Sequence, residues 1–80
     1  MNWETLDREL LDAHAKEDRD ALIRLYTEAG NQSETAGNTD AAGFYLTHAF
    51  VFALEAGSPE APHLNARLAE QGRAIMLSYQ

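Results

Sequence analysis

The chain has 80 residues, no cysteine and a formal net charge of −7. A domain of this size buries only about 60% of its unfolded surface, so tight helix packing or oligomerisation must add to its stability. The lack of cysteine excludes disulfides and thiol chemistry, and the negative charge disfavours nucleic acid and anionic membranes as partners. The first residues are acidic and amphipathic, unlike a signal peptide. We therefore expect one cytoplasmic domain over residues 1–80.

Apolar residues recur at intervals of three and four in the first half of the chain, which predicts two amphipathic helices. The first is expected over about residues 3–16, with Asn2 as N-cap. The second is expected over about residues 18–36, with Asp18 as N-cap. No Gly or Pro lies between the start of the first helix and Ala29, so one bent helix remains an alternative. The apolar stripe of the first helix contains Trp3, Leu6, Leu10 and Ala13, and the predicted buried stripe of the second contains Leu22, Leu25, Tyr26 and Ala29.

Two glycine positions bear on where the second helix ends. Gly30 and Asn31 could end it, since both residue types suit a left-handed cap. Alternatively the helix continues to Gly37 and Asn38. We favour the longer helix. A glycine inside a helix costs about 1 kcal/mol relative to alanine, and that cost is tolerated where two helices approach closely.

The segment from Thr39 to Gly57, TDAAGFYLTHAFVFALEAG, predicts a helix with almost no polar face. We expect Thr39 as its N-cap and Gly57 as its C-terminal cap. Its apolar run is too short to span a bilayer. A helix that is apolar nearly all round must be covered on nearly all sides. Either the other helices wrap around this one, or a partner covers it.

A fourth helix is expected over about residues 59–78, with Ser58 as its cap and Pro59 in its first position. Its predicted buried face includes Gly72 as a point of close helix contact. The predicted fold is thus all-α, with four antiparallel helices (about 3–16, 18–36, 39–57, 59–78) and the third one central. Besides Gly72, the predicted buried face of the fourth helix contains Ala61, Leu64, Leu68, Ile75 and Tyr79.

Small and aromatic residues at fixed spacing connect the second and third helices: Tyr26, Gly30, Gly37, Ala42 and Ala49. This spacing resembles the tetratricopeptide repeat, a helix–turn–helix unit. The resemblance covers a single repeat, about Tyr26 to Leu54. It departs from the family pattern at Ala29, Ser33, Leu46 and Leu54. It implies a tetratricopeptide-like helical hairpin at the centre of the fold and contact with other proteins.

Four side chains of the third helix, Tyr45, His48, Phe52 and Glu55, are a candidate pocket wall. We favour the simpler interpretation of His48, a histidine at the core edge that is hydrogen-bonded to a backbone carbonyl or a carboxylate. No metal-ligand spacing, nucleophile elbow or phosphate loop is present in the sequence. We therefore expect no catalytic residue, no metal and no cofactor.

Phe44, Phe50, Val51 and Phe52 point in several directions around the third helix, which makes them a candidate interface of an isologous homodimer. The predicted function is a small acidic protein–protein interaction or assembly module without catalysis, with a second copy or another protein as partner. One alternative is a ligand-binding or metal-binding protein, or an enzyme, with its pocket around His48. Another is an accessory subunit that masks a basic partner.

Overall fold

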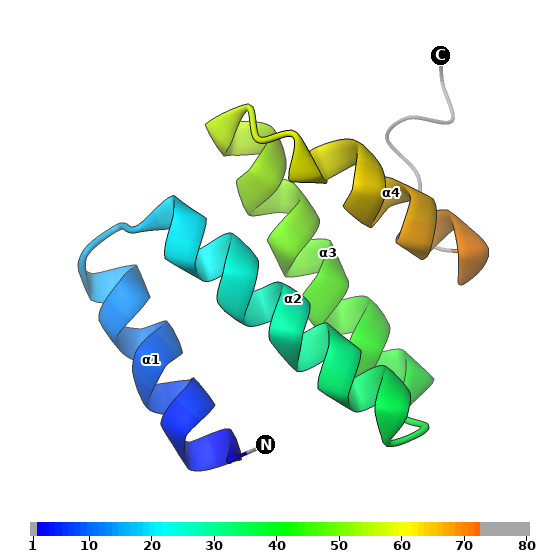
Figure 1. Cartoon of the computed structure of the whole chain (residues 1–80), viewed down its shortest axis with the longest axis horizontal. Helices are drawn as coiled ribbons and strands as arrows, with labels where there is room; N and C mark the ends of the chain where they lie inside the picture. The colour runs from blue at the N-terminus through cyan, green and yellow to red at the C-terminus, as the bar shows by residue number, and fades with distance from the viewer. Residues whose placement is uncertain (1, 73–80) are drawn as a thin grey trace.

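Four α-helices make up the computed structural model, which describes residues 2–72. They are α1 (Trp3–Ala15), α2 (Arg19–Thr35), α3 (Thr39–Ala56) and α4 (Glu60–Glu70). Consecutive helices contact one another, α1 with α2, α2 with α3 and α3 with α4, as Figure 1 shows. The predicted all-α fold of four helices is confirmed, and α1 and α2 are separate helices.

The molecule is thin, with principal-axis extents of 37 × 29 × 14 Å. The other helices therefore do not wrap α3 on all sides. It packs against α2 on one flank and α4 on another, and a third flank stays open to solvent (Figure 1).

The three connections between helices have the same local structure. Glu17, Gly37 and Gly57 each follow a helix and have φ of 53°, 79° and 64°. The backbone N–H of the next residue in each turn then donates to a carbonyl of the preceding helix. These bonds run from Asp18 to Ala13 at 2.9 Å, from Asn38 to Ser33 at 2.8 Å and from Ser58 to Ala53 at 2.9 Å. These are Schellman-type helix ends, in which a residue in the left-handed conformation lets carbonyl groups of the last turn accept hydrogen bonds from the residues that follow.

In the first two turns, the residue that donates this backbone hydrogen bond is also the N-cap of the next helix. Asp18 Oδ1 accepts from the Ala21 N–H and Asn38 Oδ1 accepts from the Ala41 N–H, both at 3.1 Å. The expectation that Thr39 is the N-cap of the third helix was wrong, because Asn38 takes that role and Thr39 is the first helical residue. An N-cap needs a side-chain oxygen that reaches the first turn, and Asn38 and Thr39 both offer one.

The start of α4 differs from the other helices. Ser58 Oγ accepts from the Glu60 N–H at 3.1 Å, while Pro59 precedes the first helical residue. The helix ends at Glu70, so the expected continuation through Gly72 was wrong. Gly72 has φ of 73° and an added Cβ there would meet nothing within 4 Å, which identifies it as a turn residue. The predictions for Ile75 and Tyr79 lie outside the described residues.

Two clusters of buried side chains hold the helices together. One joins α1 to α2, and the other joins α2, α3 and α4. Tyr26 of α2 and Phe52 of α3 are half-buried and pack against both clusters, so they link the two halves of the core. The first cluster contains Leu6, Ala13, Leu22, Leu25 and Ala29, and the second contains Ile23, Leu46, Ala49, Phe50, Ala53, Ala61, Leu64 and Leu68.

Candidate interaction surface

The open flank of α3 carries an apolar stripe. Phe44, Val51 and Leu54 are 57%, 46% and 41% exposed, and exposed Thr47 lies between Phe44 and Val51. These four residues, hereafter the α3 stripe, follow one another at intervals of three and four, so they lie on one face of the helix. No charged side chain occurs in the sequence from Ala41 to Leu54. Solvent therefore meets an uncharged strip of about three helical turns.

The four predicted interface residues separate in the structure. Phe44 and Val51 are exposed, whereas Phe52 is half-buried against both core clusters. Phe50 is 4% exposed and belongs to the core with Ala61 and Leu64, so it is not available to a partner. The prediction missed Leu54, although its spacing from Thr47 and Val51 in the sequence continues the stripe.

The helix α1 adds two further exposed apolar side chains, Trp3 and Leu11. With Phe44, Val51 and Leu54, they are the large apolar side chains that stand exposed in residues 2–72, and all of them come from α1 and α3. Trp3 stacks on Tyr45 of α3 with ring centroids 5.9 Å apart and an interplanar angle of 26°. Within residues 2–72, the large exposed apolar side chains are thus confined to the two helices that flank α2.

Tyr26 of α2 is at the centre of an aromatic cluster between α1 and α3. Its ring centroid is 5.0 Å from that of His48, 5.9 Å from that of Phe52 and 6.4 Å from that of Tyr45. Its hydroxyl is hydrogen-bonded to His14 Nε2 of α1 at 3.0 Å. Burial raises the pKa of Tyr26 above its ordinary value of 10.0, and the neighbouring Tyr45 adds to the effect. The phenol is thus held in its neutral, hydrogen-bonded form.

Three of the four candidate pocket residues, Tyr45, His48 and Phe52, therefore surround Tyr26. The fourth, Glu55, lies at the far end of α3, where its carboxylate is 3.7 Å from Nε of Arg19. His48 donates from Nδ1 to the Phe44 carbonyl oxygen at 2.9 Å, which is the simpler arrangement expected for it. The sequence showed that these side chains share one helix face, but it did not show that Tyr26 and His14 would fill the space beside them.

A cavity of about 220 Å³ opens between α1 and α3, next to this cluster. Rings of Trp3, Phe44, Tyr45 and Tyr26 line it, together with one carboxylate, Asp7. The other lining residues are Leu6, Leu10, Leu11 and His14.

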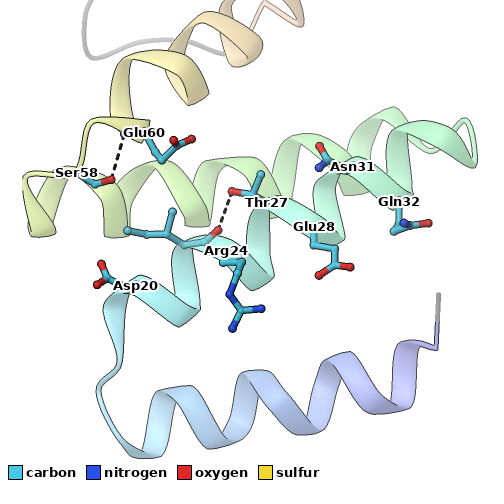
Figure 2. A pocket seen from close by; sticks show the side chains of 9 residues that line it. Asp20, Arg24, Thr27, Glu28, Asn31, Gln32, Ser58 and Glu60 are labelled. Carbon is cyan, nitrogen blue, oxygen red and sulfur yellow. Dashed lines mark hydrogen bonds between the residues drawn. The ribbon is translucent and has the colours of Figure 1, made fainter.

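A larger and shallower groove of about 610 Å³ runs along α2 to the start of α4. Its lining is mainly polar, and Figure 2 shows the side chains of Arg24 and Glu28 on the same side of α2, with Asp20 apart from them near the start of the helix. The groove is thus an open and mostly polar surface along one side of α2.

Two further features of residues 2–72 concern metal binding and membrane insertion. No group of three or more His, Cys, Asp or Glu side chains is placed to hold a metal ion there. None of the helices in that part of the chain has the length and apolar character needed to cross a membrane. Comparison with known proteins found no matching family model, no matching curated protein and no matching solved structure.

Proposed function

We propose that the protein is a non-catalytic interaction or assembly module that pairs with a second copy through the α3 stripe. The observation that carries the proposal is the exposure of Phe44, Val51 and Leu54 on a helix flank without charged residues. A small domain gains stability when such a flank is covered, because apolar surface is removed from water.

The spacing of the stripe suits helix–helix pairing. Intervals of three and four residues are those of the contact positions in a coiled coil. In an antiparallel pair about a two-fold axis, Phe44 of one copy packs on Leu54 of the other, and Thr47 packs beside Val51. In this register Asp40 of one copy and Glu55 of the other are offset by three residues, about 4.5 Å along the helix axis, so neither acid lies directly opposite another. A parallel pair would set each acid directly opposite its own counterpart, where like charges repel most strongly.

The resemblance to a tetratricopeptide hairpin supports an interaction role, and we keep it as part of the proposal. Three of its small residues, Gly30, Ala42 and Ala49, are buried where α2 crosses α3, and Gly37 forms the turn. The proposed location is the cytoplasm, with which a chain without cysteine is compatible.

The test is the molar mass in solution, measured by light scattering on a size-exclusion column over a dilution series. The expected result is a mass near twice 8.9 kDa that falls only at high dilution. Val51→Glu or Leu54→Glu should give a monomer with unchanged helix content, because each places a charge within the apolar seam.

Leu11→Glu is the matched control for these variants. Leu11 is 65% exposed, lies on α1 outside the α3 stripe although it lines the same cavity as Phe44, and acquires the same charge. It should leave the mass unchanged. A wild-type monomer at every concentration would overturn the proposal, as would dissociation by Leu11→Glu to the same degree as by Leu54→Glu.

A further inference from the structure

The cavity between α1 and α3 has walls of aromatic rings. The rings of Phe44 and Tyr45 are 5.4 Å apart at an interplanar angle of 74°, so they form a corner. Trp3 extends the Tyr45 side of this corner with its stacked ring. The faces of aromatic rings carry partial negative charge and attract cations, tryptophan most strongly. Trp3 and Phe44 are both exposed, which leaves their rings accessible to a ligand.

The charges around the cavity favour a cation as well. Among the lining residues that lie within 2–72, Asp7 is the one carboxylate, and neither Lys nor Arg is present. Asp7 is exposed, and within residues 2–72 it has no salt bridge. A cation that enters would therefore meet an unpaired carboxylate in a chain whose net charge is −7. It would not have to displace a resident positive group.

The apolar part of the lining defines the ligand further. Leu6, Leu10 and Leu11 form the α1 side of the cavity, and its volume is about 220 Å³. This lining suits a cationic group on a short hydrocarbon stem. Lys and Arg side chains have this form, since their methylene stems pack on apolar surface while the charged head stays near water.

We propose that this cavity binds the cationic side chain of a Lys or Arg residue from a protein partner. The aromatic corner and the carboxylate of Asp7 hold the charged head, and the leucines of α1 contact the stem. This site shares Phe44 with the α3 stripe, whose centre in the proposed pair is at Thr47 and Val51, whereas two other rings of its lining, Trp3 and Tyr45, lie outside the stripe. It gives the module a means of contacting a basic partner as well as a second copy.

The emission of Trp3 tests the proposal directly, because it is the only tryptophan in the chain and lines the cavity. The probe for the Lys side chain is n-butylammonium chloride, and the probe for Arg is n-propylguanidinium chloride. n-Butanol is the uncharged control, and sodium chloride controls for ionic strength. A saturable change of emission is expected with at least one of the cations and with neither control.

Two variants of α1 test whether the carboxylate of Asp7 contributes to cation binding. Asp7→Asn should weaken binding about threefold, as expected for the loss of one exposed ion pair. Glu9→Gln removes the same charge from the same helix at an exposed residue that does not line the cavity, and should leave the affinity unchanged.

Three results would overturn the site. The first is that n-butanol binds as tightly as n-butylammonium, and the second is that Asp7→Asn and Glu9→Gln lose equal affinity. The third is the absence of a saturable emission change up to about 0.2 M of either cation, a range chosen because exposed cation–π contacts are weak. The titration is repeated on Leu54→Glu. Cation binding by a monomeric protein would leave the cavity proposal standing while self-association failed.

Discussion

Gly30 of α2 lies directly against Leu46 of α3. A Cβ added to Gly30 would be 2.6 Å from Leu46 Cδ2 and 2.7 Å from Cγ. Real Cβ atoms do not approach other carbons this closely, and Leu46 is fully buried and surrounded by core residues. The missing side chain therefore sets the distance between the two central helices.

We expect Gly30→Ala to destabilise the protein, although alanine is the better helix former. The overpacking costs about 1–3 kcal/mol, against a gain of about 1 kcal/mol in helix propensity. Urea unfolding followed by circular dichroism measures the difference. In a Leu46→Ala background the same change should cost less, because the clashing atoms are gone. A Gly30→Ala protein more stable than wild type would show that the helices can separate without cost.

The α2–α3 hairpin was the most predictable part of the fold. Of the two uses that the sequence allowed for Gly30, the favoured one, a close contact in mid-helix, is confirmed, as is the turn at Gly37. Gly72 was harder, because a glycine on an apolar face can mark either close contact or the end of a helix.

The orientation of α3 could not be predicted from its sequence. On an amphipathic helix, polar residues show which face meets solvent, but this helix is apolar nearly all round. Phe44 and Phe50 therefore looked equivalent, and only the packing against α2 and α4 buries Phe50 and exposes Phe44. For the same reason, the contact of Tyr26 with His14 had no sequence signal, since it depends on how α1 folds back along α2.

The first interhelical turn has a residue poorly suited to it. Glu17 has φ of 53° at the position where the next two turns have Gly37 and Gly57. A left-handed conformation costs a non-glycine residue about 1–2 kcal/mol, and glycine loses part of this advantage through its greater freedom when unfolded. We expect Glu17→Gly to stabilise the protein by about 0.5–1 kcal/mol.

The reverse change at the equivalent position, Gly37→Ala, is the companion experiment. It should destabilise by about 1 kcal/mol, with both variants measured by the same urea unfolding. Within residues 2–72, Glu17 makes no interaction beyond its backbone turn that replacement by glycine would remove. Destabilisation by Glu17→Gly would mean that the carboxylate contributes more than the backbone strain costs.

Two side-chain hydrogen bonds join α4 and the residue after it to the end of α2. Glu34 accepts from Arg67 Nη2 at 2.7 Å and from Gln71 Nε2 at 2.8 Å. The groups are partly exposed, so the coupling between Arg67 and Glu34 should be about 0.5 kcal/mol in a double-mutant cycle of Arg67→Ala and Glu34→Ala. Amide exchange in the last turn of α4 should speed up in either variant. A coupling of zero would show that burial of Leu64 and Leu68 alone positions α4.

The raised pKa of Tyr26 makes stability depend on alkaline pH. Burial disfavours the phenolate in the folded protein, so the folded state keeps the phenol proton at a pH where the unfolded chain, with a pKa near 10.0, releases it. The contribution of this group is complete below the unfolded pKa and is lost as pH rises through the folded pKa.

The free energy of unfolding should therefore fall more steeply in wild type than in Tyr26→Phe as the pH rises above the unfolded pKa of 10.0, because the variant has no phenol to titrate at this position. The variant also loses the hydrogen bond to His14, which lowers its stability at every pH. The comparison accordingly rests on the slope with pH and not on the absolute value. Urea unfolding at a series of alkaline pH values gives both slopes. Equal slopes would mean that Tyr26 ionises in the folded protein as readily as in the unfolded chain, and that the aromatic cluster around it admits water.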